Sequence, residues 1–339
     1  MNKLSHAIIG CGRIAQNHIN ACKENDISVV CCCDIDLEKC KSFANSNGII
    51  RITNDYFTLI NDDSIDSISI CTDHASHMEI ASHFFEKKHI IIEKPVSTKC
   101  KKVLIEDLHT EKIVTVISQH RFDYLVNFVR KLVNSGDLGR ITLVNGKLQC
   151  YRSPEYYRDS YWRGTIDKEG GSTVINQSYH IIDTLIYLFG KPNRIYAFKN
   201  SFKYENIIET EDTCVAIFEY PNMLVSFSST NTAVMDWSTN IEIIGTEGTI
   251  SFTIDFPEVI TEFCVNEKIK TKYIDELQTI ERNYNNNLNL AANYYGLSHN
   301  AQFKNFKNAI MGYESIRIGI EDAMETLSVI EEIYRCANS

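Results

Sequence analysis

The first third of the chain alternates short apolar runs with amphipathic stretches, as expected of a β–α fold. The clearest run is His89–Ile92, three isoleucines closed by Glu93, Lys94 and Pro95. A continuous apolar run indicates a strand buried on both faces, and proline cannot continue it. Strands are expected at 7–9, 28–33, 49–53, 67–71, 90–92 and 113–118, with helices at about 13–23, 37–45, 56–60, 75–87 and 99–109. The pattern predicts a six-stranded, doubly wound parallel Rossmann sheet.

The pattern changes after Arg121. A linking helix is expected at 122–133, a long strand at 141–150 and a helix at 173–189 that ends at Gly190. Hairpin signals then pair strands 212–219 with 223–229 and 240–244 with 249–254, and helices follow at about 301–311 and 320–336. We therefore predict two domains: a Rossmann domain, 1–121, and an α+β domain, 122–339, with a large, mostly antiparallel open sheet.

A glycine-rich loop follows the first strand and opens the first helix, in the form G-x-G-x-x-A. Gly10 permits the tight turn, and Gly12 lets the backbone approach a pyrophosphate, which the helix amino terminus at Arg13 and Ile14 would receive. Asp34 ends the second strand at the spacing of an acid that binds a ribose 2′-hydroxyl. Because a carboxylate repels a 2′-phosphate, NAD is the expected cofactor rather than NADP.

Polar residues follow the later strands at their carboxyl ends, where open α/β sheets bind ligands. We expect these residues beside the cofactor: Thr72, His77, Glu93, Lys94 and Gln119. His77 has two possible roles, contact with the cofactor or capping and packing, and capping and packing is favoured.

The helix expected at 173–189 carries Asn176, His180 and Asp183 at i, i+4 and i+7, so they share one face. Buried polar groups need partners. Either Asp183 holds a structural histidine, or this face carries a catalytic site.

Three motifs resemble those of the Gfo/Idh/MocA oxidoreductases, which include glucose–fructose oxidoreductase and inositol dehydrogenase. They are the glycine loop, the Glu93-Lys94-Pro95 triplet and the run from Gly170 to Asp183. The resemblance implies that Lys94 and His180 flank a sugar hydroxyl, with His180 as general base, and that Trp162 and Arg163 serve the cofactor. Inositol-dehydrogenase-like members carry aspartate where this chain has Asn176, so Asn176 is expected to bind substrate or cofactor instead.

A longer match, Trp162 to Thr165 with Gly170-Gly171 and Asn176-Gln177, resembles a branch that oxidises C3 of UDP-N-acetylglucosaminuronic acid. Arginines at 152, 158 and 163 stand among tyrosines here, and guanidinium groups suit carboxylate and phosphate. The expected substrate-binding residues are Lys94, Arg158, Arg163, Asn176, Gln177 and His180, with Arg152 expected in solvent. Alternatives are a 3-ketosugar reductase, a free-sugar or inositol dehydrogenase, and a cofactor-binding regulator without turnover.

The composition of the chain limits the kinds of partner and the location that we expect for the protein. The chain has 44 acidic and 34 basic residues and a net charge of −10, which argues against nucleic acid. No apolar run approaches membrane-spanning length, and the amino terminus enters a strand directly, so a cytoplasmic protein is expected. Its 12 cysteines lack metal-ligand spacing, so free thiols and no metal are expected. Apolar residues on both faces of the second sheet predict a homodimer or, favoured, a homotetramer.

Overall fold

The computed structural model describes residues 3–100, 110–255, 258–287 and 297–337. The chain forms two compact units, Met1–Gln119 with Tyr295–Met324, and His120–Tyr294 with Glu325–Ser339. Among the described residues, no helix has both the length and the apolar character needed to cross a membrane.

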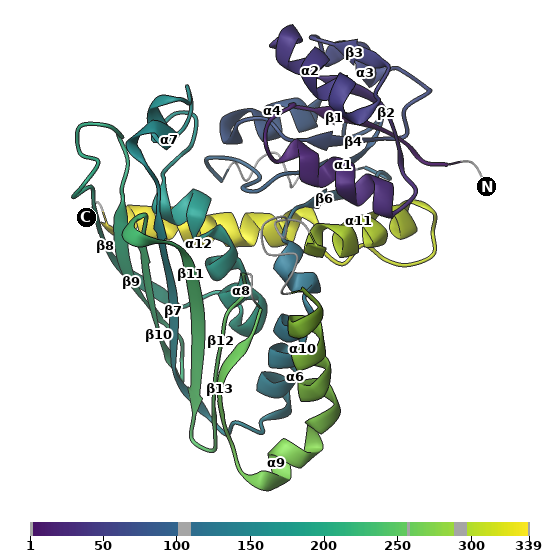
Figure 1. Ribbon diagram of the computed structural model, residues 1–339. Coiled ribbons are helices and arrows are strands. Elements are labelled where there is room, and N and C mark those ends of the chain that lie inside the picture. Colours follow the sequence, from purple (N-terminus) through teal and green to yellow (C-terminus); the bar gives the residue numbers. More distant parts are fainter. Residues whose placement is uncertain (1–2, 101–109, 256–257, 288–296, 338–339) are drawn as a thin grey trace. The chain divides into compact units, whose positions relative to one another are not determined.

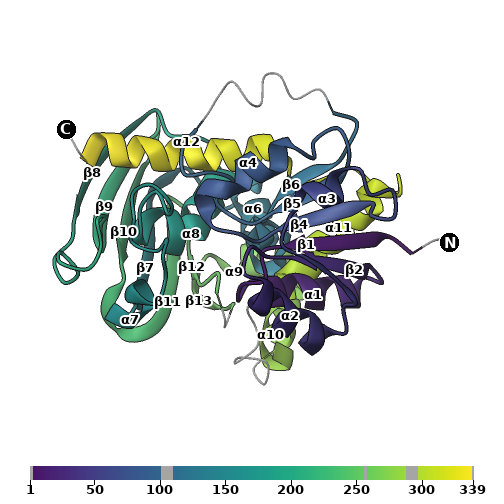
Figure 2. The same cartoon turned by 90° about the horizontal axis from the view of Figure 1, so that it is seen from above.

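The first unit contains the predicted six-stranded parallel sheet, in the order β3-β2-β1-β4-β5-β6 (Figure 2). Its strands are β1 (Ser5–Ile9), β2 (Ser28–Cys33), β3 (Arg51–Thr53), β4 (Ser67–Ile70), β5 (His89–Ile92) and β6 (Val114–Val116). Its helices are α1 (Ala15–Glu24), α2 (Leu37–Asn47), α3 (Phe57–Ile60), α4 (His77–Ser82) and α11 (Leu297–Ile310). Most of the helix expected at 99–109 lies outside the described residues. The Rossmann prediction is confirmed.

The strand order reverses between β1 and β4, which is where an open sheet leaves a crevice beyond its strand ends. Gly10 follows β1 with φ +93°, and a Cβ there would lie 2.6 Å from the carbonyl carbon of Cys71, just after β4. Glycine is therefore required for the two strand ends to come this close.

The division of the chain into units differs from the predicted domains in the carboxyl-terminal part of the sequence. The prediction gave all residues beyond 121 to the second domain, but 295–324 belong to the first unit. Helix α11 lies beside α1 (Figure 1) and buries Phe303 and Phe306 in one core cluster with Leu4, Ile27 and Ile91. This apolar face completes the first unit, which local pattern alone does not reveal.

The second unit is built on a seven-stranded sheet, in the order β13-β12-β11-β7-β10-β9-β8. Only the β7–β10 pair is parallel, as the prediction of a mostly antiparallel sheet requires. The strands are β7 (Ile141–Tyr151), β8 (Arg194–Asn200), β9 (Thr213–Glu219), β10 (Leu224–Thr230), β11 (Thr232–Gly245), β12 (Thr249–Phe252) and β13 (Ile260–Cys264). The sequence analysis missed the two edge strands, β8 and β13.

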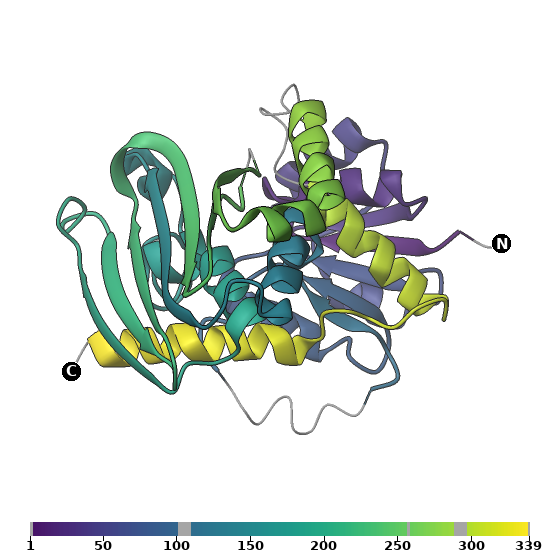
Figure 3. The ribbon, with the colours of Figure 1, turned by 90° about the horizontal axis from the view of Figure 1, so that it is seen from below.

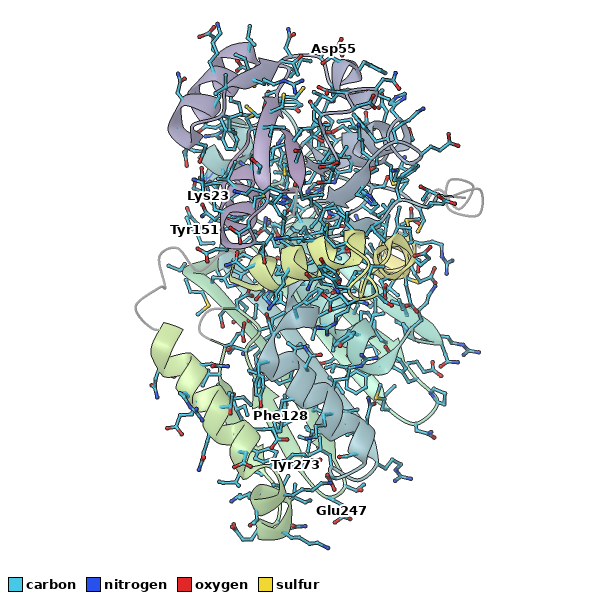
Figure 4. The ribbon with its side chains drawn as sticks, turned by 90° about the vertical axis from the view of Figure 1, so that its right-hand side faces the viewer. Lys23, Asp55, Phe128, Tyr151, Glu247 and Tyr273 are labelled. Atoms are coloured by element: carbon cyan, nitrogen blue, oxygen red, sulfur yellow. The ribbon has the colours of Figure 1, made fainter. Side chains whose placement is uncertain are left out.

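Helices cover one face of this sheet in layers (Figures 1 and 3). Helix α8 (Tyr179–Phe189) packs on β7, α6 (Tyr124–Ser135) packs on α8, and α10 (Ile274–Asn287) packs on α6. The rings of Phe128 in α6 and Tyr273 meet edge to face, 5.6 Å between centroids, and are labelled in Figure 4. Short helices α7 (Pro154–Arg158) and α9 (Glu267–Lys272) and the part of α12 (Ile320–Ala337) from Glu325 on complete the unit.

Candidate functional site

The glycine loop of the first unit has room for a phosphate. A Cβ on Gly12 would meet no atom within 4 Å, and the loop leads directly into α1 at Ala15. Arg13, which is exposed, and Ile14, which is half-buried, precede the helix and present backbone amides at its amino end. Open space over a helix amino terminus suits the pyrophosphate of a dinucleotide, so the loop fits the predicted cofactor.

Asp34 lies at the end of β2 and is held in place in part by the glycine loop. Its two oxygens accept hydrogen bonds from the amides of Cys11, at 2.8 Å, and Asp36, at 3.0 Å. The ammonium of Lys39, on α2, lies 3.0 Å from the same carboxylate. Sequence analysis missed Lys39 as a partner of Asp34. Its place in the first turn of α2, shortly after β2, was the available signal. Asp34 is thus a fixed acceptor at the end of β2, and its binding of a ribose hydroxyl stays a prediction.

His77 joins two of the strand ends. Its Nε2 lies 3.1 Å from the carbonyl oxygen of Thr72 and its Nδ1 2.7 Å from that of Pro95, which follows a cis peptide bond. The ring is 1% exposed, and burial lowers its pKa. These contacts favour the packing alternative for His77: it positions the Lys94 loop rather than offering a polar atom to a cofactor.

Glu93 lies in a buried network inside the first unit. One oxygen is 2.9 Å from Nε2 of His18 and 3.5 Å from Nε2 of His299, and the other accepts the Lys94 amide at 3.1 Å. Burial alone would raise the pKa of Glu93, but hydrogen bonds and charge from His18 and His299 hold it well below its usual value. Glu93 therefore fixes the backbone of Lys94, whose side chain is half-buried. Gln119, which was also expected beside the cofactor, is buried after β6. No local signal links Glu93 to His18 and His299, because both lie far from it in sequence.

The helix predicted at 173–189 is broken. Residues Thr173–Gln177 form a π-helical turn, and α8 begins only at Tyr179. Backbone amides of Gln177 and Ser178 reach back five residues, to the carbonyls of Ser172 and Thr173. Such turns are frequent at functional sites, and this one changes the angular spacing that was assumed between Asn176 and His180.

Two buried glutamates, which sequence analysis missed, stabilise the π-helical turn. Glu211 accepts hydrogen bonds from the amides of Ser172 and Val174, both at 3.0 Å. Glu169 accepts the side-chain amide of Asn176 at 2.5 Å and the backbone amide of Gly164. Burial raises the pKa of Glu169 to about 8. The Asn176 nitrogen is thus held by the protein itself.

Asp183, expected as a partner of His180, is bound by two other side chains. Its carboxylate accepts two hydrogen bonds from the Arg121 guanidinium, at 3.1 and 2.8 Å, and a third from the Thr326 hydroxyl at 2.8 Å. His180 is 7% exposed and packs edge to face on the ring of His120, with 4.9 Å between centroids. Arg121 thus binds both oxygens in a bidentate salt bridge, and an orienting role of Asp183 toward His180 stays a prediction.

Two arginines stack on one tyrosine near the π-helical turn. The guanidinium carbons of Arg152 and Arg163 lie 5.0 and 4.2 Å from the Tyr156 ring centre. Arg152 also donates two hydrogen bonds to Oε1 of Gln177, at 2.7 and 3.2 Å. The expectation that Arg152 lies in solvent was therefore wrong.

The two remaining residues of this segment differ in exposure. Arg158, expected to bind substrate, is exposed on α7. The ring of Trp162 lies 5.1 Å from the guanidinium carbon of Arg163. The second unit thus brings together Arg152, Tyr156, Trp162, Arg163 and Gln177. In the same unit Asn176 is bound by Glu169 and His180 packs on His120, whereas Lys94 belongs to the first unit.

Comparison with known proteins agrees with both units. Residues 4–118 match the sequence model of the oxidoreductase family GFO/IDH/MocA, described as an NAD-binding Rossmann fold, and 126–251 match that family's C-terminal domain. An uncharacterised oxidoreductase of Bacillus subtilis, YrbE, is 29% identical over 71% of each chain. Myo-inositol 2-dehydrogenase of Thermotoga maritima is 22% identical over 81% of this chain and 86% of its own length.

Among solved structures, the WlbA dehydrogenase of Bordetella pertussis, determined with NADH and UDP-GlcNAcA, superposes with a TM-score of 0.88. It covers 99% of this chain and 96% of its own, at 24% identity. At this identity the likeness establishes the fold.

Proposed function

The chain belongs to the GFO/IDH/MocA family of NAD-binding oxidoreductases, and from this premise we propose that it oxidises C3 of a UDP-linked N-acetylglucosaminuronate. NAD is the cofactor, and when bound it supplies the hydride acceptor. The finer assignment of substrate draws on the arginine pair of the second unit and on the ligand of the WlbA structure.

The residues of this chain divide the remaining work. Gly10 and Gly12 leave space for the pyrophosphate, and Asp34 offers its carboxylate to a ribose hydroxyl. Lys94 polarises the reacting hydroxyl oxygen, and His180 accepts the hydroxyl proton as general base. Oxidation then releases one hydride and one proton from the sugar, and reduction of a ketosugar would reverse both transfers.

The observation that carries the substrate proposal is the arginine pair around Tyr156. Within the described part of the chain, Nε of Arg163 is buried and has no hydrogen-bond acceptor. A buried donor without an acceptor is costly, so an anionic group of a ligand would satisfy it. Stacking on Tyr156 holds both guanidinium groups in place, which suits a carboxylate or phosphate more than an uncharged sugar.

The test is NADH formation with UDP-N-acetylglucosaminuronate, compared with myo-inositol and glucose. We expect the nucleotide sugar to have the highest kcat/KM. Arg152→Ala and Arg163→Ala should each raise its KM by about tenfold or more, since hydrogen bonds to charged groups contribute about 1.5–3 kcal/mol. Arg140→Ala is the matched control, because Arg140 is exposed in the second unit and is not among the predicted substrate-binding residues, and its KM should stay within about twofold.

Several outcomes would separate the parts of the proposal. Equal efficiency with myo-inositol would reject the nucleotide-sugar substrate and leave the dehydrogenase intact. A rise in the KM of NAD alone for Arg163→Ala would assign Arg163 to the cofactor, the role that the family resemblance implied. Turnover only in the direction of reduction would favour the 3-ketosugar reductase.

We also propose that the protein is a homo-oligomer, with a homotetramer favoured. On the face of the second sheet opposite α8, β8 and β9 place Tyr196 against Ile217 and Phe198 against Val215 as direct neighbours. All four side chains are at least 38% exposed, and Phe198 is 81% exposed. Contiguous apolar surface of this kind marks an interaction site, and a second copy of the same face would cover it.

A further inference from the structure

His120 lies between two carboxylates in the second unit. Its Nδ1 is 2.5 Å from Oδ2 of Asp123, and its Nε2 is 3.5 Å from Oδ1 of Asp255. A carboxylate accepts hydrogen bonds, so an acceptor at each ring nitrogen favours the form in which both nitrogens carry a proton. The ring is 4% exposed, and Trp237 fixes Asp255 by donating from Nε1 at 2.7 Å. The geometry is that of a buried imidazolium.

The pKa of His120 agrees with this geometry. Burial alone would lower the pKa, but the charge and hydrogen bonds of Asp123 and Asp255 raise it well above its usual value. His120 therefore carries its charge at neutral pH.

This charged ring packs directly against His180. The ring planes meet at 80° with 4.9 Å between centroids, and both side chains are buried. Among the described residues, the ionisable groups near this pair include Glu258, close to His120 and Asp123, and the Tyr179 ring, edge-on to His180. Asp183, one turn further along α8, is paired with Arg121.

We infer that His120 positions His180 and keeps it in the neutral form that a proton acceptor requires. Two effects follow from the contact. An edge-to-face neighbour restricts rotation of the His180 ring. A second positive charge at this distance is also opposed by the one already present, so a proton arriving on His180 is disfavoured. This role rests on the proposed function of His180 as the general base.

Loss of the charge on His120 should reverse the electrostatic effect on His180, from opposing its protonation to favouring it. A neutral side chain at position 120 would leave Asp123 and Asp255 facing His180 without their cation. Carboxylates near an imidazole favour its protonated form. The proposal therefore predicts that His120→Gln makes His180 easier to protonate.

The test is a titration of the ten histidines by NMR in protein labelled at histidine Cε1, which needs no turnover. The His180 signal is assigned by its loss in His180→Asn. In the parent protein His120 should remain charged throughout pH 5–8. In His120→Gln the midpoint of His180 should rise by about one pH unit or more, and the acid limb of kcat/KM should move with it, about tenfold in rate below the limb.

Controls separate charge from structure. His120→Lys restores a cation between the carboxylates and should bring the His180 midpoint back toward the parent value. His83→Gln, at an exposed position on the first unit, should change neither titration. A neutral His120 in the parent, or an unchanged His180 midpoint in His120→Gln, overturns the inference. Absence of sugar oxidation with the titrations as expected would reject the proposed function alone.

Discussion

At the scale of single residues, the least expected feature is a carboxyl group whose protonation the fold controls. Glu169 is fully buried and accepts hydrogen bonds from Gly164 and Asn176. Burial raises its pKa from the ordinary 4.5 to about 8. Between these two values the unfolded chain loses the proton while the folded protein keeps it, so this group makes stability fall as pH rises from 4.5 to 8.

Glu169→Gln should remove that fall, because an amide does not titrate in this range. We expect the variant to gain stability relative to the parent between pH 5 and pH 8, by more than about 1 kcal/mol, since one pKa unit corresponds to about 1.4 kcal/mol. Above pH 8 the difference should become constant. Urea unfolding at a series of pH values measures it, and parallel pH profiles of the two proteins would contradict it.

The places of single residues in the fold were predictable only where neighbours in the chain determine them, and the roles of these residues stay predictions. Gly10, Gly12 and Asp34 follow from a strand–loop–helix pattern that the structure repeats. The salt bridge between Asp183 and Arg121 did not follow, because helical spacing points from Asp183 to His180 and Arg121 lies far from it in sequence. Glu169 and Glu211 had no signal in the sequence, because their importance comes from burial beside a turn that was expected to be regular helix.

At the scale of elements, the π-helical turn depends on a close approach that only glycine allows. A Cβ on Gly171, where φ is +154°, would lie 1.8 Å from the hydroxyl oxygen of Tyr334. That hydroxyl donates to Glu211 at 2.9 Å and accepts the amide of Ile175 at 3.2 Å. A methyl group would displace Tyr334 and leave Glu211 with one donor fewer.

Gly171→Ala should therefore destabilise the second unit by more than about 2 kcal/mol, through collision as well as loss of a buried hydrogen bond. Gly136→Ala is the matched control: φ is +74° but a Cβ would meet nothing within 4 Å, so only the left-handed conformation costs energy, about 1–2 kcal/mol. Thermal or urea unfolding of both variants measures the difference. Equal losses would show that Tyr334 moves aside freely.

The pattern of elements was largely predictable. Strand β5 of the first sheet is buried on both faces and is a continuous apolar run, and β7, β9 and β10 alternate clearly. Edge strands β8 and β13 escaped because one or both of their faces are exposed: Phe198 is 81% exposed in β8, and no residue of β13 is fully buried. The π-helical turn before α8 was not predicted, because the sequence of Thr173–Gln177 continues the helical periodicity of α8.

At the scale of the whole molecule, the apolar face of β8 and β9 makes assembly testable. Phe198→Lys should shift the protein to a smaller species by light scattering, because a charge within this apolar patch would have to be buried between copies. Ile50→Lys is the control, since Ile50 is 94% exposed outside this sheet. An unchanged mass for Phe198→Lys would place the contact between copies elsewhere.

The return of α11 to the first unit has a consequence for biosynthesis. A ribosome completes β1 to β6 long before it reaches Phe303 and Phe306, the two rings that fill the core beside Leu4 and Ile27. Until then Leu4 and Ile27 lack the two rings that pack against them in the folded protein. The amino-terminal third is therefore incomplete as a module for gene fusion, because Phe303 and Phe306, far beyond β6 in the chain, supply part of its interior.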